Sequence, residues 1–331
     1  DEGIVTVDAR DNMDCVPGGI NLTEATAEGS CRIGVFYNLD ASIPHNAGSA
    51  SRIKVLLRDD CVVGRPKFPV GTSVATTNVN ERLVIAVAAC FAGMGKPHGL
   101  AEGGHMQAAG MAVISGIDSR KSSGKRPYVN QMFIGYASGP GNHGHDGWIT
   151  YLASENGGMI VLDSIEVDEA MYPIIVEGRW LEKDTLGPGE FDGAPGVKLI
   201  YRPIADDMTV IYASDGEINV ARGVLGGKDA GPAMNFKRLS NGELVRLPAF
   251  HQELVKPGEA IVCQAAPGGG YGDPFEREPW RVADTVNRGW ISAERSESLY
   301  GVALSQAANG IEFEVDQLRT DELRHRHSAK A

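Results

Sequence analysis

Glycine constrains this chain more than any other feature of its sequence, because 42 of the 331 residues are glycine. Glycine adopts positive φ angles without steric cost and lets two backbones approach closely, but it weakens the interior of helices and strands. Many of these glycines stand beside proline, asparagine or aspartate, a pattern typical of turns. We therefore expect a β-rich protein with many loops and tight turns.

The rest of the composition is that of a folded globular chain. Hydrophobic residues make up 42% and charged residues 22% of the sequence, close to the averages for globular proteins. The length exceeds what one hydrophobic core usually covers, so we expect one large domain or two closely packed domains.

The charge pattern argues against several classes of function. The net charge is −12, whereas a nucleic-acid partner needs a coherent basic surface. No apolar run reaches the roughly 18 to 20 residues that span a bilayer, and residues 1–20 lack the order of a secretory signal. We expect a cytoplasmic enzyme without a nucleic-acid or membrane partner.

The cysteines indicate neither a zinc site nor a disulfide framework, because none of them forms a CxxC pair. We expect buried free thiols, above all at Cys90, which stands inside an apolar run. The five cysteines are Cys15, Cys31, Cys61, Cys90 and Cys263.

Hydrophobic periodicity predicts the elements of the first 127 residues. Alternation over residues 3–10 predicts a strand. Since an unpaired edge strand promotes aggregation, we expect it to pair with a segment that precedes it in the gene or with another chain. Thr23 is a candidate helix N-cap, and apolar side chains four residues apart predict a helix from there to Leu39. A strand over residues 51–57 and a buried helix over residues 80–91 follow.

From about Tyr128 the pattern becomes that of strands, with turns between them. This favours a sandwich or barrel over alternating βαβ units. Two helices are predicted after Pro279, over residues 282–288 and 293–304. The predicted strands cover residues 129–136, 160–167, 174–181, 197–201 and 209–213.

The expected fold class is α+β: β-rich, with glycine-rich loops, a few buried helices and a C-terminal helix pair. Three regions are expected. Residues 1–127 form an α+β region that completes a domain begun by a missing N-terminal segment. Residues 128–278 form a β-rich sandwich or barrel-like domain, and residues 279–331 form a helical tail.

The loop over residues 139–147 is the richest candidate for chemistry. It carries Asn142, His143, His145 and Asp146 among glycines. Such a loop can lay its backbone against a substrate while its side chains act as acid, base or metal ligand. We predict His143, His145 and Asp146 as catalytic residues and Asn142 as a substrate contact. No distant third metal ligand can be named, so no metal site is assigned to this chain; a solvated or structural loop is the alternative.

Two further polar residues are predicted to contact substrate in the same pocket. Asn78 stands at the entry to the helix over residues 80–91, where free N–H groups suit an anion or a carbonyl oxygen. His105 follows two glycines; a structural histidine is the alternative. The chain has no G-x-S-x-G elbow, no G-x-x-x-x-G-K-[ST] loop and no G-x-G-x-x-G turn that joins a predicted strand to a predicted helix, so neither a serine hydrolase nor a nucleotide site is predicted.

The segment over residues 266–274 is rich in glycine and has two interpretations. A phosphate cradle would make Gly269 and Gly270 substrate contacts, and we predict them as such. The segment has no lysine and no following helix N-terminus, which favours the alternative of a turn packed closely against another backbone.

A series of short motifs stands in one order along the chain: PHNAG (44–48), TTNVNER (76–82), YPI (172–174), GPGEFDGAPG (187–196), GVLGGK (223–228) and PGGGYGDP (267–274). This order resembles the B-type subunits of hydantoinases and the matching half of 5-oxoprolinases, and acetone and acetophenone carboxylase subunits are similar. The resemblance covers nearly all of the chain. Its most specific part is the closing glycine-rich motif followed by paired helices.

The resemblance implies a division of labour between subunits. In that family an A-type subunit uses ATP to phosphorylate a lactam, imide or enolate oxygen. The B-type subunit then hydrolyses or carboxylates the activated species and carries a divalent metal, Zn or Mn, held by His and Asp. This implies a component of the B-type subunit of an ATP-dependent cyclic amide hydrolase, with ATP bound by an A-type partner. A ketone carboxylase subunit and a non-catalytic structural subunit are the alternatives.

Two departures from the family pattern affect these expectations. Family B subunits are longer at the N-terminus, and the metal motifs belong to that region. We therefore expect the N-terminal portion of the subunit, as a separate or cleaved chain, to be a partner that holds most of the metal site. Family members also often place paired arginines before the Gly-Leu-Gly-Gly turn, whereas residues 215–218 read Asp-Gly-Glu-Ile here, which removes positive charge from that position.

Overall fold

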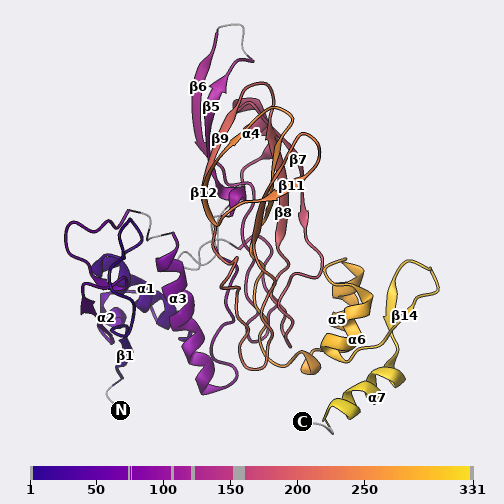
Figure 1. Ribbon diagram of the computed structural model, residues 1–331. Coiled ribbons are helices and arrows are strands. Elements are labelled where there is room, and N and C mark those ends of the chain that lie inside the picture. The colour runs from indigo at the N-terminus through magenta and orange to yellow at the C-terminus, as the bar shows by residue number, and fades with distance from the viewer. Residues whose placement is uncertain are drawn as a thin grey trace. The chain divides into compact units, whose positions relative to one another are not determined.

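The computed structural model describes residues 3–73, 75, 77–105, 108–120, 124–151 and 161–328. These residues fall into two compact units, one that runs to Leu100 and one that begins at Ala101 (Figure 1). The α-helices are α1 (Glu24–Phe36), α2 (Ala47–Ala50), α3 (Val79–Cys90), α4 (Ile165–Met171), α5 (Pro279–Asn287), α6 (Ala293–Tyr300) and α7 (Gln317–Ser328).

The strands are short in the first unit and longer in the second. Those of the first unit are β1 (Val5–Asp8), β2 (Ile53–Leu56), β3 (Arg58–Asp59) and β4 (Gly64–Arg65). Those of the second unit are β5 (Val113–Asp118), β6 (Arg126–Gln131), β7 (Ile174–Leu181), β8 (Val197–Pro203), β9 (Met208–Ala213), β10 (Met234–Arg238), β11 (Leu244–Arg246), β12 (Phe250–Val255), β13 (Ala260–Gln264), β14 (Leu304–Gln306) and β15 (Phe313–Val315).

The first unit packs α1 and α3 against each other and against the parallel pair β1–β2. α1 begins at its predicted N-cap, where the Thr23 side chain accepts a hydrogen bond from the Thr26 N–H at 3.2 Å. Gly34 lets α3 approach α1, because a Cβ there would lie 2.7 Å from the Val84 carbonyl oxygen. The predicted elements of this region are confirmed, but β1 has its neighbour, β2, within the same chain.

The second unit is built on two antiparallel sheets. One has the order β11-β10-β13-β8-β7 and the other the order β12-β9-β5-β6. Buried side chains from both sheets form one hydrophobic core, among them Ile114 and Val210 of one sheet and Leu199 and Ile261 of the other. β5 pairs with β9, so it lies in the second unit, whereas the sequence placed residues 101–127 with the N-terminal region. The expected α+β, β-rich fold is confirmed.

Three of the five predicted strands of this unit are confirmed, one is confirmed in part and one is wrong. The strand predicted over residues 129–136 ends at Gln131, the last residue of β6, and residues 132–136 are not in a strand. β7 has the predicted bounds, and β8 and β9 cover their predicted ranges. The strand predicted over residues 160–167 is instead coil followed by α4, and residue 160 lies outside the described residues. Ser164 caps this helix by accepting a hydrogen bond from the Val167 N–H, and acidic residues fill its first turn, which favours a helix start over a strand.

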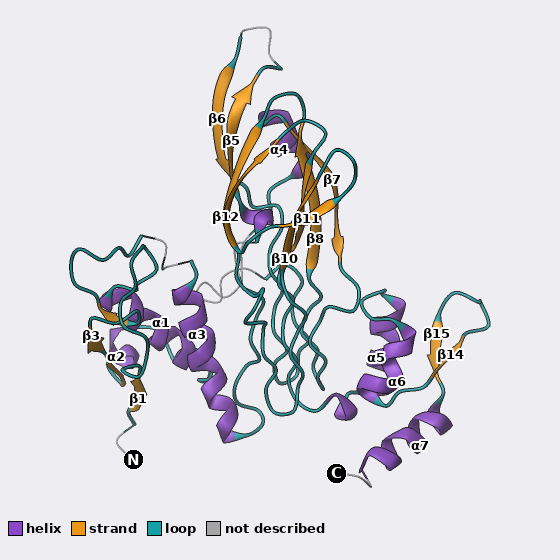
Figure 2. Ribbon diagram, in the orientation of Figure 1, coloured by secondary structure: helices purple, strands orange, loops and turns teal. Residues whose placement is uncertain are grey.

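Five glycine-rich segments that precede, connect or follow these strands run alongside one another, joined by backbone hydrogen bonds. The Gly141 N–H donates to the Gly269 carbonyl at 2.9 Å, and the Gly187 N–H donates to the Gly268 carbonyl at 2.9 Å. We call this array the glycine bundle; Figure 2 shows it as teal loops that extend beyond one end of the sheets. Its segments are residues 101–105, 137–148, 184–196, 221–231 and 265–273.

Glycine is required in this bundle because neighbouring backbones occupy the space of a side chain. A Cβ on Gly187 would lie 2.6 Å from the Lys228 carbonyl oxygen and 2.7 Å from the Gly269 Cα, which is closer than van der Waals contact allows. The interpretation of residues 266–274 as a segment packed against other backbone is therefore confirmed. The tight turns expected from the glycine content are present as well, but close backbone packing accounts for the densest glycine runs.

The C-terminal region packs two helices and a hairpin. α5 and α6 bury Val282, Val286 and Tyr300 in a second hydrophobic cluster, and α6 ends at Gly301, whose φ of 61° is left-handed. The helix pair was predicted from the sequence. The β14–β15 hairpin and α7 were not. Within the described part of the chain, no helix is long and apolar enough to cross a membrane.

The cysteines differ in exposure. Cys31, Cys61 and Cys263 are buried free thiols, as predicted. Cys90 is exposed, so its predicted burial is wrong: it lies at the last position of α3, and the apolar run that contains it does not turn this side chain into the core.

Candidate functional site

The predicted loop over residues 139–147 forms a tight turn that presents its two histidines. The Asn142 N–H donates to the His145 carbonyl at 3.0 Å, and the His145 N–H donates to the Asn142 carbonyl at 3.1 Å. Gly144, the third residue of this turn, has a φ of 89°, which a glycine adopts without strain. His143 and His145 are both exposed, so their imidazoles can reach a molecule bound outside the bundle.

Side chains beside this turn fix part of it. The His143 ring lies against Phe191 and Tyr271, with ring centroids 5.8 Å and 6.2 Å away. The Asn142 Oδ1 atom is buried and has no hydrogen-bond partner within the described part of the chain, so it is an acceptor that a ligand could satisfy.

Asp146 points inward and is held by two arginines. It forms a bidentate pair with Arg277, with Arg277 Nη1 2.7 Å from Oδ1 and Nη2 2.9 Å from Oδ2, and Arg281 Nη2 lies 2.7 Å from Oδ2. Burial raises the pKa of Asp146, but the hydrogen bonds and charges of both arginines outweigh it and hold the pKa below its usual value. A carboxylate held in this way positions a loop and is a poor proton acceptor.

A second carboxylate extends this network into the interior. Asp192 is 2% exposed and lies with its Oδ2 atom 3.2 Å from Arg277 Nε, and its Oδ1 atom accepts hydrogen bonds from the Tyr300 hydroxyl and the Gly189 N–H. Burial raises the pKa of Asp192 to about 6, although the Arg277 charge opposes the shift. The network therefore ties the histidine loop and the glycine bundle to α5 and α6.

Arg277, Arg281, Asp192 and Tyr300 were not predicted as site residues. A usable signal was present, because Arg277 and Arg281 are basic residues directly after the most specific glycine motif and beside the start of a predicted helix.

A cavity of about 350 Å³ adjoins this network. Guanidinium groups and indole rings line much of it, a combination that suits a planar or anionic ligand. Its arginines also pair within the protein: Arg281 with Asp146 and Arg288 with Asp284. The lining residues are Asp146, Gly147, Arg277, Trp280, Arg281, Asp284, Thr285, Arg288 and Trp290.

The other predicted substrate contacts belong to other segments of the chain. Asn78 is the N-cap position of α3 in the first unit, whereas the remaining candidates belong to the second unit. His105 is buried, with Nε2 3.9 Å from a Glu102 carboxylate oxygen. Gly269 and Gly270 lie inside the glycine bundle, where the Glu102 and Lys228 carbonyls accept their N–H groups. Their roles in substrate binding stay predictions.

Gly269 and Gly270 also have their carbonyl groups engaged. These accept hydrogen bonds from the Gly141 and Val224 N–H groups. Both backbone groups of each glycine are thus used within the bundle, which supports packing as the role of these residues rather than a phosphate cradle.

No group of three or more His, Cys, Asp or Glu side chains that could hold a metal ion occurs among the described residues. The donors at the histidine loop do not form such a set, because Asp146 is committed to Arg277 and Arg281.

The fold and the loop together define a β-rich protein whose strands continue into a packed glycine bundle. The family model described as Hydantoinase B/oxoprolinase matches residues 1–274, and the chain belongs to this family. The resemblance seen in the sequence motifs is thereby confirmed.

Individual relatives point the same way. Caprolactamase subunit beta of Pseudomonas jessenii is 27% identical over 317 residues, which are 94% of this chain and 53% of that protein. The crystal structure of the ATP-dependent caprolactamase from Pseudomonas jessenii matches 97% of this chain and 54% of its own chain, with a TM-score of 0.81 and 23% identity. A nucleotide-free acetone carboxylase structure matches 98% of this chain and 47% of its own, with a TM-score of 0.77 and 18% identity.

These matches have one common feature. The chain spans about half the length of the relatives it matches. The two solved structures share its fold.

Proposed function

We propose that this chain is a component of the B-type subunit of an ATP-dependent cyclic amide hydrolase. It would act on a lactam or imide that an A-type partner subunit has phosphorylated with ATP. The observation that carries the proposal is the likeness to caprolactamase subunit beta over 94% of this chain, together with membership of the Hydantoinase B/oxoprolinase family.

The chemistry explains why phosphorylation precedes hydrolysis. Amide resonance makes the carbonyl carbon of a lactam a poor electrophile. A phosphoryl group on the carbonyl oxygen removes that resonance, so that water can add to the carbon. Cleavage of the ring C–N bond then leaves an acyl phosphate, and a second water hydrolyses it to the amino acid and inorganic phosphate. A proton must leave the attacking water and another must reach the ring nitrogen, which is the task of a general acid and base.

The histidine loop supplies suitable groups for these transfers. His143 and His145 are exposed imidazoles on one tight turn, and histidine exchanges protons near neutral pH. We assign the proton transfers to this pair and a substrate contact to Asn142. Asp146 acts through the loop, as a positioning residue that anchors it to Arg277 and Arg281.

Two groups implied by the family are assigned to partners. ATP belongs to the A-type subunit, because this sequence has no phosphate-binding loop. A divalent metal, Zn or Mn, would be held mainly by the portion of the B-type subunit that this chain does not span. The described residues offer no ligand set for it, so no catalytic step is assigned to a metal here.

A ketone carboxylase subunit is the second candidate. The match to acetone carboxylase over 98% of this chain supports it, although the sequence identity is lower than that to the caprolactamase structure. A non-catalytic structural subunit is the third, supported by the ion pairs that commit Asp146 to structure.

One assay of the complete complex separates the first two candidates. The complex is incubated with ATP and either lactams and hydantoins or ketones with bicarbonate, and ADP release is measured. The proposal expects ADP release that depends on the cyclic amide. ADP release that depends on a ketone and bicarbonate would replace the hydrolase with the carboxylase.

A further inference from the structure

The outer edge of β1 carries backbone groups that no strand pairs within the described part of the chain. β1 and β2 form a sheet of two strands. The Val5 and Ala9 N–H groups donate to the Arg52 and Leu56 carbonyls, at 2.9 Å and 3.0 Å. Because successive residues of a strand direct their backbone groups to opposite edges, the N–H and C=O groups of Thr6 and Asp8 face away from β2.

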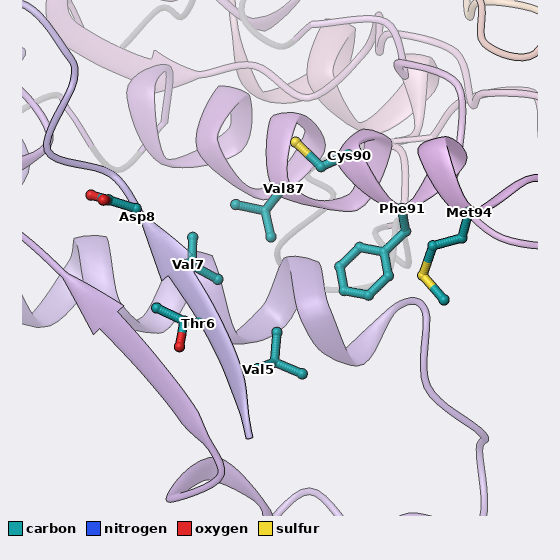
Figure 3. A pocket seen from close by; sticks show the side chains of 8 residues that line it. All are labelled: Val5, Thr6, Val7, Asp8, Val87, Cys90, Phe91 and Met94. Atoms are coloured by element: carbon teal, nitrogen blue, oxygen red, sulfur yellow. The ribbon is translucent and has the colours of Figure 1, made fainter. Parts of the chain in front are cut away.

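A groove runs along this open edge. It has a volume of about 340 Å³, and Figure 3 shows β1 on one side of it and the end of α3 with the following turn on the other. Its lining is mainly apolar. We call it the β1 groove; it is lined by Val5, Thr6, Val7, Asp8, Val87, Cys90, Phe91 and Met94.

The groove continues the core of the first unit. Val5, Val7 and Phe91 pack against the buried cluster that contains Val87, whereas Met94 is 65% exposed. A partner laid in the groove would therefore extend an existing core and cover an apolar side chain that is now exposed.

The backbone groups of the open edge indicate the secondary structure of the segment that binds there. Backbone donors and acceptors repeat at Thr6 and Asp8, two residues apart, which is the spacing that another β-strand satisfies. Apolar side chains at alternate positions of that strand would face Val87, Phe91 and Met94. A helix or a small ligand would satisfy the apolar surface but leave the strand edge unpaired.

The relatives show where such a strand could come from. This chain covers 53% of caprolactamase subunit beta. In the caprolactamase crystal structure, the match includes 97% of this chain but only 54% of the caprolactamase chain. Nearly half of each relative is thus additional chain attached to the same fold. An isolated open edge promotes non-specific pairing, so a dedicated strand from that additional portion is the occupant that both observations favour.

We propose that a β-strand from the portion of the B-type subunit that this chain does not span pairs with β1 through Thr6 and Asp8 and places apolar side chains in the β1 groove. This inference rests on the proposal that the chain is a component of a B-type subunit. It adds the location and the geometry of the contact.

Amide hydrogen exchange and crosslinking of the complete complex test the contact. Exchange is measured by mass spectrometry with fragmentation that resolves single residues. We expect the Thr6 and Asp8 amides to be protected as strongly as those of Val5 and Val7. Rapid exchange at Thr6 and Asp8 beside protected neighbours would overturn the proposal.

A photoreactive benzoylphenylalanine in place of Met94 identifies the occupant. We expect it to crosslink to a peptide from the portion of the B-type subunit outside this chain. A crosslink to a second copy of this chain, a crosslink to the A-type subunit, or no crosslink at all would each contradict the proposal.

Two variants of Thr6 provide a matched pair. Thr6→Pro removes the outward N–H and leaves the inward groups of β1 in place, whereas Thr6→Val keeps the N–H and favours a strand. We expect Thr6→Pro to lower the Met94 crosslink yield at least tenfold and Thr6→Val to leave it unchanged. Equal yields in the two variants would count against strand pairing.

If Thr6→Pro does not fold, the exchange measurement on the unsubstituted complex decides alone. These readouts report contact and not turnover. If the complex is a carboxylase, the strand contact at β1 can still be present, and only the proposed function fails. If the complex is an active hydrolase without the strand contact, only the inference about β1 fails.

Discussion

Arg277 and Asp146 form a bidentate ion pair across 131 positions of the chain, with nitrogen–oxygen distances of 2.7 Å and 2.9 Å. The Arg277 side chain is 2% exposed, and that of Asp146 is 28% exposed. The pair joins the start of the C-terminal helical region to the loop that carries both exposed histidines. It therefore links the stability of the fold to the geometry of the candidate site.

Replacing Arg277 with alanine should destabilise the protein by about 3–5 kcal/mol, because it leaves the buried Asp192 without its cation and Asp146 with Arg281 alone. The measurement is the free energy of unfolding in urea. As a control, Arg326→Ala removes an exposed i,i+4 ion pair and should change stability by less than about 0.5 kcal/mol. Similar losses in both variants would refute a special role for the Arg277 network.

Replacing His143 or His145 with alanine should lower turnover of the assembled complex by about 10²- to 10⁴-fold if the residue transfers a proton. Folding should be little affected, because both side chains are exposed. His325→Ala, a change at another exposed histidine, is the control and should keep turnover within about twofold. If turnover is unchanged in both loop variants, the loop has no part in the mechanism.

Replacing Gly193 with alanine should prevent stable folding of the second unit, because the new Cβ would overlap the Gly268 carbonyl group. The loss should be at the upper end of single substitutions, on the order of 4 kcal/mol or more. Gly29→Ala is the matched control, since Gly29 lies within α1 and a Cβ there meets nothing within 4 Å. It should stabilise the protein by about 0.5–1 kcal/mol. Thermal melts of both variants provide the comparison.

Replacing Asp168 with asparagine should change how stability depends on pH. Burial and the charge of Asp163 raise the pKa of Asp168 from 3.8 to about 6 in the folded protein. The folded state thus binds this proton more tightly than the unfolded state. The stabilisation is complete below pH 4 and is lost as the pH rises to about 6.

The size of this change follows from the raised pKa. Ionisation of Asp168 should lower the free energy of unfolding by an amount on the order of 1–3 kcal/mol between pH 4 and pH 6, and Asp168→Asn should abolish this decrease. The melting temperature of the variant, relative to that of the unsubstituted protein, should therefore increase from pH 4 to pH 6. A constant difference over this range would show that Asp168 titrates normally.

Local signals in the sequence predicted local structure well. The alternation from Ile174 to Leu181 predicted β7 with its observed bounds, and Thr23 located the start of α1. Where two local signals conflicted, the prediction failed. The apolar residues around Ile165 suggested a strand. The segment is instead helix α4, which the Ser164 cap and the acidic residues of the first turn favour.

The glycine bundle and the ion network depend on contacts between distant segments. Gly141 bonds to Gly269, and Asp146 to Arg277, although more than 100 positions of the chain separate the members of each pair. The glycine content indicated that backbones could pack closely here. No periodic pattern in the sequence predicts which segments become neighbours. For the same reason the histidine loop was identified from its residue types, while the arginines that hold it were not.

Product analysis of the complete complex tests the central claim most directly. The complex, and the same mixture without this chain, are each incubated with ATP and a lactam, and ADP and the ring-opened amino acid are quantified by mass spectrometry. The account predicts that the amino acid forms in proportion to ADP and only when this chain is present. Ring opening without this chain, or fixation of bicarbonate onto a ketone with no ring opening of any cyclic amide, would contradict it.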